Sequence, residues 1–126
     1  MIELLIQEQV WNLNKSFNIS RGAKITADTL QVHLIKDGEK GLGECVPYSR
    51  YDETIDSVKN QIIELQLDIE SEKINLNNLS SYLKPGAARN AIDCAFWDLL
   101  EKRKKLHLIN LLIKIHLIIL KFMQVA

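Results

Sequence analysis

The sequence predicts an α+β domain in which a three-stranded antiparallel meander is followed by a helical bundle and a C-terminal apolar helix. Three observations predict this class. Apolar and polar residues alternate in the first fifty positions, the apolar spacing changes to steps of three and four after Asp52, and the last fifth is mostly Leu and Ile. The 126 residues suit one hydrophobic core and are too few for a (β/α)₈ barrel of about 250 residues.

The first fifty residues are predicted to form the meander. Aliphatic residues alternate with polar ones weakly over 2–6 and cleanly over 29–34, which places three aliphatic side chains on one face of a strand. The dipeptide Asp37-Gly38 suits a tight hairpin turn, so the following residues should return as the paired strand. Gly41 and Gly43 within that strand indicate a close backbone approach or a bulge.

Two helices are predicted after the meander. Asp52 and Glu53 lie where acidic residues favour a helix N-terminus, and Lys84-Pro85-Gly86 breaks the chain before the second helix. Small alanines in the second helix permit a close approach to a neighbour. The predicted buried stripes are Ile55, Val58, Ile62, Leu65 and Ile69 in the first helix, and Ala88, Ala91, Ile92, Ala95, Phe96 and Leu99 in the second.

Charge is distributed unevenly along the chain. Residues 1–101 hold 10 Lys+Arg and 16 Asp+Glu, a net of −6, whereas residues 102–126 hold 6 Lys+Arg and no acid, a net of +6. The apolar tail that follows the basic run 102–105 is compatible with a helix. We rank self-packing or oligomerisation of this tail first and association with an acidic lipid surface second. A membrane span ranks last, because Lys114 would lie at its centre.

Several classes of protein and site are disfavoured. Cys45 and Cys94 are too few and too far apart for a disulfide framework, which favours a reduced intracellular protein. The N-terminus lacks a basic region before its apolar residues, so we expect no signal peptide and a cytoplasmic location. The motif Gly41-x-Gly43 lacks the third glycine and the helix of a dinucleotide fingerprint, and no nucleic-acid partner is expected.

No metal site is expected from the acidic or histidine residues. Asp98 with Lys102 and Glu101 with Lys105 have the spacing of ordinary helical ion pairs. The three histidines lack ligand spacing, so zinc is disfavoured.

The stretch 17–24 is a candidate binding loop. Arg21 and Lys24 are two cations three residues apart, and together they could hold a ligand that carries a carboxylate. A flexible polar turn explains the same residues and ranks first from the sequence alone, and the position of the two cations does not decide between the readings.

Three longer strings carry a family resemblance. They are Phe17-x-Ile19-x-Arg21-Gly22, Gly41-x-Gly43-Glu44-Cys45-x-Pro47-Tyr48-x-Arg50-Tyr51-x-Glu53 and Pro85-x-Ala87-Ala88-Arg89-Asn90-Ala91-x-Asp93-Cys94-Ala95-x-Trp97-Asp98-Leu99. The chain thereby resembles the N-terminal domain of the enolase superfamily, of the mandelate racemase and muconate lactonizing type. Within that superfamily it resembles the dipeptide epimerases that act on L-Ala-D/L-Glu.

The resemblance implies a division of labour between two domains. Residues 1–112 would form a substrate-capping domain over the mouth of a (β/α)₇β barrel, and the barrel would hold two catalytic lysines and Mg²⁺. Residues 113–126 depart from the family pattern as a divergent apolar tail, and the chain ends where the barrel would begin. We therefore expect no catalytic residue, no metal ligand and no cofactor in this chain, which would be inactive alone.

The resemblance also implies roles for individual residues and for partners. Arg21, Lys24 and Tyr51 become candidates for substrate binding, with Lys24 meeting the side-chain carboxylate of the substrate. Glu44, Arg89, Asn90 and Asp93 are expected to link the sheet to a helix instead. The alternatives to a capping fragment are an interaction module that completes a separately encoded barrel or pairs with a second copy, and a small membrane-associated protein.

Overall fold

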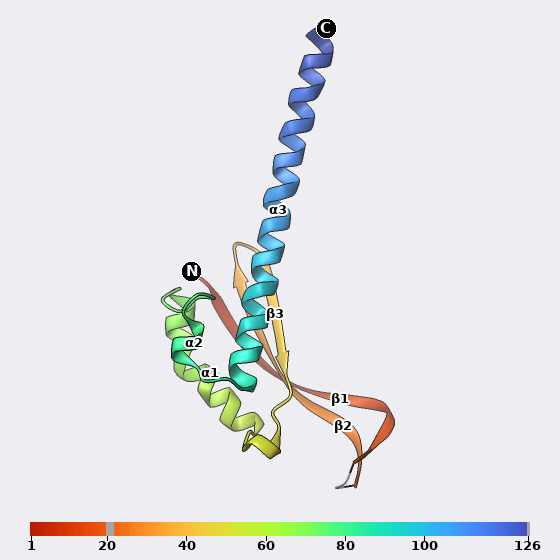
Figure 1. Ribbon diagram of the computed structural model, residues 1–126, viewed down its shortest axis with the longest axis vertical. Helices are drawn as coiled ribbons and strands as arrows, with labels where there is room; N and C mark the ends of the chain where they lie inside the picture. The colour runs from red at the N-terminus through yellow and green to blue at the C-terminus, as the bar shows by residue number, and fades with distance from the viewer. Residues whose placement is uncertain (20–21, 126) are drawn as a thin grey trace.

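The chain folds as a three-stranded antiparallel sheet with helices packed on one face (Figure 1). The structure, a computed structural model, describes residues 1–19 and 22–125; the side chains of 13–26, 106 and 124–126 lie outside the described part. The sheet order is β1-β2-β3, a simple meander, which confirms the predicted fold class. The elements are β1 (Glu3–Ile19), β2 (Gly22–Lys36), β3 (Glu39–Cys45), η1 (Ser49–Tyr51), α1 (Ile55–Glu70), α2 (Leu79–Tyr82) and α3 (Ala87–Val125).

The first two strands extend well beyond the third. β3 pairs with β2 only from Lys36 to Leu30, whereas β1 follows β2 from Ile35 down to Gly22. The register between β1 and β2 shifts between Asn12 and Phe17. Residues 10–19 and 22–28 therefore form a two-stranded arm that projects from the three-stranded part of the sheet (Figure 1).

The hairpin between β2 and β3 turns where the sequence predicts. Asp37 and Gly38 have φ of 50° and 81°, the left-handed backbone that a tight two-residue turn requires. Alternate residues of β2 then point to the core, where Leu30, Val32 and Leu34 are fully buried. The predicted alternation is confirmed for this strand.

The glycines of β3 allow helix α3 to lie against the strand backbone. A Cβ at Gly41 would sit 2.7 Å from the Leu99 amide nitrogen, and one at Gly43 would sit 2.9 Å from the Ala95 nitrogen. Real Cβ atoms do not approach that closely, so only glycine fits at these positions. Of the two explanations suggested by the sequence, the structure supports close approach.

The helices bury the stripes that their spacing predicts. In α1, Val58, Ile62 and Ile69 are buried, and Ile55 and Leu65 pack against them. The buried residues of α3 are Ala87, Ala88, Ala91, Ile92, Ala95, Phe96 and Leu99. The core thus lies between one face of the sheet and the first half of α3.

α3 is one continuous helix of 39 residues, and its second half leaves the body of the domain (Figure 1). Every residue from 107 to 123 is exposed. The prediction of a helical tail is confirmed. Self-packing onto the domain is wrong for residues 107–123, because all of them are exposed; among the residues of α3 whose burial is described, Leu99 is the last buried apolar one.

Candidate functional site

The candidate site is the end of the domain opposite the C-terminus, which we call the loop end. It comprises the segment 46–54, the N-terminus of α3 and the far end of the β1–β2 arm. Figure 1 shows these segments toward the same end of the long axis. Of the predicted substrate-binding residues, Arg21 lies outside the described residues, Lys24 is placed by its backbone in β2, and Tyr51 is in η1. Substrate binding by these three residues stays a prediction.

Tyr51 is held in a compact turn that presents two aromatic rings. Its amide nitrogen donates to the Tyr48 carbonyl at 2.9 Å, and Asp52, with φ of 57°, donates to the Ser49 carbonyl at 3.0 Å. The Tyr48 and Tyr51 rings lie 5.5 Å apart between centroids, tilted by 56°. Because Tyr51 is 73% exposed, its ring is available for a ligand rather than for the core.

The turn is anchored at two helix N-termini. The Glu53 carboxylate accepts a hydrogen bond from the Ala87 amide at 2.8 Å, at the first residue of α3. The next residue, Thr54, caps α1: its hydroxyl accepts from the Ser57 amide at 3.0 Å, and the Ser57 hydroxyl accepts from the Thr54 amide. The sequence predicted that Glu53 lies at the N-terminus of a helix. It does, but the helix that it caps is α3 and not the adjacent α1.

Glu44 joins the three strands where the arm leaves the sheet. Its Oε2 accepts hydrogen bonds from the Thr29 hydroxyl at 2.7 Å, the Trp11 indole at 3.0 Å and the Gln31 amide at 3.2 Å. These donors, Thr29 first, hold the pKa of Glu44 below its ordinary value. The expected link from Glu44 to a helix is therefore wrong. Its side chain lies on the face of the sheet that α3 does not cover.

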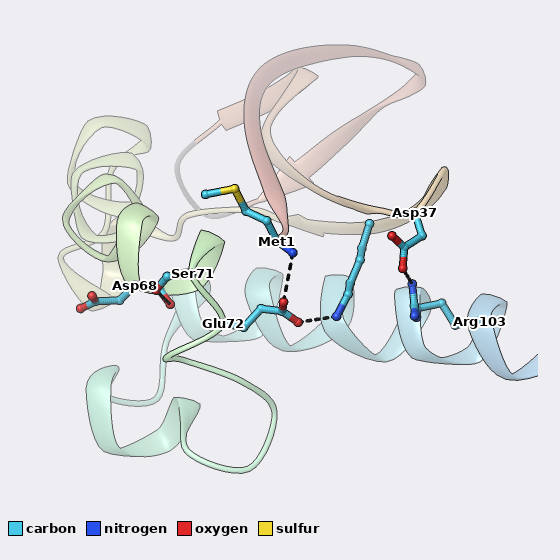
Figure 2. Close-up of polar contacts among 7 residues, drawn as sticks. Met1, Asp37, Asp68, Ser71, Glu72 and Arg103 are labelled. Atoms are coloured by element: carbon cyan, nitrogen blue, oxygen red, sulfur yellow. Dashed lines mark hydrogen bonds and ion pairs between the residues drawn. The ribbon is translucent and has the colours of Figure 1, made fainter.

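Other residues link the sheet to α3. Asp98 accepts from the Leu42 amide at 2.8 Å, and this hydrogen bond is the main reason that the pKa of Asp98 is lowered. Lys102 donates to the Lys40 carbonyl at 2.6 Å. Arg103 pairs with Asp37 at 2.8 Å and lowers the pKa of that carboxyl (Figure 2). The predicted ion pairs Asp98–Lys102 and Glu101–Lys105 are both present.

Arg89, Asn90 and Asp93 were expected to bridge helix and sheet, and the structure places them elsewhere. With Pro85 and Gly86 they line a shallow polar hollow at the start of α3. Within the described part of the chain, none of the three makes a hydrogen bond or ion pair to the sheet. The reason is the face of the helix: Ala91 and Ala95 pack on the backbone of β3, so the side chains of Arg89 and Asp93, two positions from Ala91, point away from the strand.

The N-terminus of the chain is held by an ion pair with Glu72. The Met1 amino group pairs with Glu72 at 3.3 Å, and Lys36 pairs with the same carboxylate (Figure 2). Lys36 is the main cause of the lowered pKa of Glu72. This cluster orders the start of β1 and lies away from the loop end.

Cys45 and the acidic and histidine residues are the candidates for a nucleophile and for a metal cluster. Burial raises the pKa of the Cys45 thiol to about 11, so that thiol is protonated at neutral pH and is a poor nucleophile. Among the residues that the structure describes, no three His, Cys, Asp or Glu side chains come close enough to hold a metal ion. The Mg²⁺ implied by the resemblance therefore does not fit these residues.

The fold defines an α+β domain, a three-stranded antiparallel meander followed by helices, with exposed loops at one end. The family model "Mandelate racemase / muconate lactonizing enzyme, N-terminal domain" matches residues 1–112. The chain belongs to this family, and so to the enolase superfamily.

Two curated relatives act on glutamyl compounds. The L-Ala-D/L-Glu epimerase of Escherichia coli (strain K12) is 41% identical over 105 residues, which are 83% of this chain and 32% of that protein. The N-acetyl-D-glutamate racemase of a Pseudoalteromonas species is 47% identical over 74 residues, 57% of this chain and 24% of that protein. The chain thus spans about a third or less of the length of these relatives.

Solved structures agree with the fold. An enolase family member from Agrobacterium tumefaciens with homology to dipeptide epimerases, solved with sodium and L-Ala-L-Glu, gives a TM-score of 0.78 at 36% identity. It covers 83% of this chain, and 32% of that protein is matched. A dipeptide epimerase from Methylococcus capsulatus, solved with Mg and L-Arg-D-Lys, gives 0.63 at 25% identity over 79% of this chain and 31% of that one.

Among the described residues, one helix is long and apolar enough to cross a membrane, judged by length and composition alone. It is α3, counted from Ala87 to Met123. One side of its first half packs in the core of the domain, and the continuous run of exposed apolar residues lies in its second half.

Proposed function

We propose that this chain is the substrate-capping domain of a dipeptide epimerase that acts on L-Ala-D/L-Glu. The observation that carries the proposal is the 41% identity with an L-Ala-D/L-Glu epimerase over 83% of the chain. The loop end of this chain also presents an exposed aromatic pair, Tyr48 and Tyr51, that a ligand could contact. The catalytic groups would come from a barrel domain, and this 126-residue chain would be inactive by itself.

The two curated relatives suggest the substrate class. L-Ala-D/L-Glu and N-acetyl-D-glutamate share a glutamate whose nitrogen is acylated. Their common features near the reacting carbon are an amide nitrogen and a side-chain carboxylate. A cation on the capping loop would bind that carboxylate, and Lys24 and Arg21 are the candidates. A lysine provides a point charge without the bidentate geometry of arginine. Contact with Lys24 would therefore discriminate between substrates by their charge more than by their shape.

A chimera tests the proposal directly. Residues 1–112 of this chain would replace the corresponding domain of the E. coli epimerase, which supplies a working barrel. We expect the chimera to exchange the glutamyl α proton of L-Ala-D-Glu for deuterium in a Mg²⁺-dependent manner, followed by NMR. A folded chimera that leaves every N-acylglutamate unchanged would contradict the proposal.

Variants of the chimera test the residues at the loop end. Lys24→Met should reduce kcat/KM for L-Ala-D-Glu more than for a dipeptide with a neutral second residue, because the proposed contact of this charge is with the side-chain carboxylate. Tyr51→Ala should reduce kcat/KM for both substrates, because its exposed ring carries no charge that would distinguish them. Lys84→Met, an exposed lysine outside the three predicted binding residues, is the matched control and should leave both values unchanged.

A split enzyme would use the same exposed surface of α3 as a covalently attached barrel. Trp97 on α3 is 57% exposed and lies on the opposite side of the helix from the buried stripe. An exposed tryptophan on a packed helix is suited to a further domain. Co-expression of this chain with a separate barrel would distinguish the cases: recovered epimerisation and a stable complex support a split enzyme, whereas activity only in the covalent chimera supports a domain of one longer chain.

A further inference from the structure

The second half of α3 is an apolar helix with no protein partner in the described structure. We call residues 107–123 the tail helix. Twelve of its residues are large apolar side chains that are each at least 41% exposed. They are Leu108, Ile109, Leu111, Leu112, Ile113, Ile115, Leu117, Ile118, Ile119, Leu120, Phe122 and Met123. An exposed apolar surface of this extent is unfavourable in water and marks an interaction site.

The apolar surface is too wide for a single partner helix. At about 100° per residue, His107, Asn110, Lys114 and Lys121 fall within an arc of about 60°. Apolar side chains occupy the rest of the circumference, interrupted only by His116. A second helix covers one stripe of its neighbour, so pairing with another copy would leave most of this surface in water. The acyl region of a lipid layer can cover a broad arc at once.

The net positive charge of the C-terminal segment favours an anionic lipid. Residues 102–126 contain six Lys+Arg and no acid. Lys102 and Arg103 pair with Asp98 and Asp37 of the domain itself. In the described part of the chain, Lys104, Lys114 and Lys121 have no ion-pair partner. Parallel packing of a second copy would bring these unpaired cations together, whereas an anionic headgroup layer neutralises them.

The polar stripe favours a helix that lies in the plane of the interface. Lys114 is near the middle of the tail helix, so a spanning orientation would put its charge deep in the hydrocarbon. In the plane, Asn110, Lys114 and Lys121 reach the headgroups together while the apolar arc faces the acyl chains.

We propose that the tail helix binds in the plane of a bilayer that contains anionic lipid and so holds the capping domain at a membrane surface. This inference goes beyond the proposed function and does not depend on it. The epimerase chimera contains residues 1–112 only, so failure of that experiment leaves this one untouched.

Vesicle binding by the purified full chain tests the inference. The protein is added from dilute mild detergent to vesicles of phosphatidylcholine alone or of equal parts phosphatidylcholine and phosphatidylglycerol, and the bound fraction is measured by flotation. We expect binding to the anionic vesicles that weakens in high salt. Each lysine near an anionic surface raises the binding affinity about fivefold. The double variant Lys104→Gln with Lys121→Gln should therefore bind anionic vesicles about 25-fold more weakly, with no such change on neutral vesicles.

A matched pair of tail variants separates the orientations. Ile119→Asp, in the apolar arc, should abolish binding, whereas Asn110→Asp, in the polar stripe, should retain most of it. Alkaline carbonate should release the bound wild-type chain.

Four results would overturn the inference. They are equal binding to neutral and anionic vesicles, retention after alkaline carbonate, a stable oligomer that vesicles do not dissociate, and a monomer that binds neither vesicle. Retention would indicate a spanning helix, and the oligomer would indicate a second copy as the partner.

Discussion

The closest approach between sheet and helix gives the sharpest test of the packing. An alanine at Gly43 would place its Cβ 2.8 Å from the Ala91 carbonyl carbon and 2.9 Å from the Ala95 nitrogen. Ordinary van der Waals contact begins near 3.4 Å, so strand and helix must separate. The obstructing atoms belong to the helix backbone and cannot rotate away. Overpacking typically costs 1–3 kcal/mol, and we expect Gly43→Ala to cost about 3 kcal/mol.

Urea unfolding of the full chain, followed by far-UV circular dichroism, measures this loss. Gly38→Ala is the matched control, since nothing lies within 4 Å of its added Cβ. Gly38 has φ of 81°, so its variant should lose only about 1 kcal/mol from backbone conformation. Ala91→Gly should not rescue Gly43→Ala, because the clash is with the backbone of residue 91. Equal stability of the two glycine variants, or rescue by Ala91→Gly, would refute the packing argument.

Three further predictions follow from polar contacts. Thr54→Ala removes the cap of α1 shared with Ser57 and should lower the free energy of unfolding by about 1 kcal/mol in the same urea assay, while an unchanged midpoint would contradict the cap. Asp98→Ala removes the acceptor of the Leu42 amide, and we expect a loss of about 1 kcal/mol in thermal unfolding. The pKa of Glu44 is lowered in the folded state, so its contribution is present above the ordinary glutamate value of 4.5 and is lost as pH falls through the folded value. Unfolding measured against pH should therefore show a steeper acid loss in the wild type than in Glu44→Gln.

The parts of the fold that sequence predicts are those set by local patterns. Alternation over 29–34 specifies which face of β2 is buried, and Asp37-Gly38 specifies a turn that needs left-handed backbone. The stripe of α1 follows in the same way from its spacing. Each of these depends on residues within one or two turns of one another, so no knowledge of the partner is needed.

The parts that sequence does not predict are set by residues far apart in the chain. Glu53 is adjacent to α1 but caps α3, 34 positions later. The donors to Glu44 come from β1 and β2, and register decides that they meet. One signal was available for Trp11: an indole N–H on an exposed strand position needs an acceptor, and an acid on a neighbouring strand can supply it.

The candidate site also combines features set by local sequence with features set by distant residues. Tyr51 is exposed, and its pairing with Tyr48 is consistent with their spacing of three residues in a tight turn. The proposed grouping of Arg21 and Lys24 with Tyr51 comes from the family resemblance and from no local pattern. More than twenty residues separate Lys24 from Tyr51, so a sequence pattern alone does not relate their positions.

Helix α3 shows why helical pattern alone does not locate the edge of the folded domain. No Gly or Pro interrupts residues 87–125, and Leu, Ile and Lys all support a helix, so local propensity carries the helix past the domain. The tertiary contacts end earlier: among the described side chains of α3, Leu99 is the last buried apolar residue and Arg103 is the last one bonded to the β2–β3 hairpin. The described residues 107–123 are all exposed, so they gain no packing energy from the domain. An isolated helical segment in water is marginally stable, so the residues after Arg103 depend on whatever surface binds them for their helical structure.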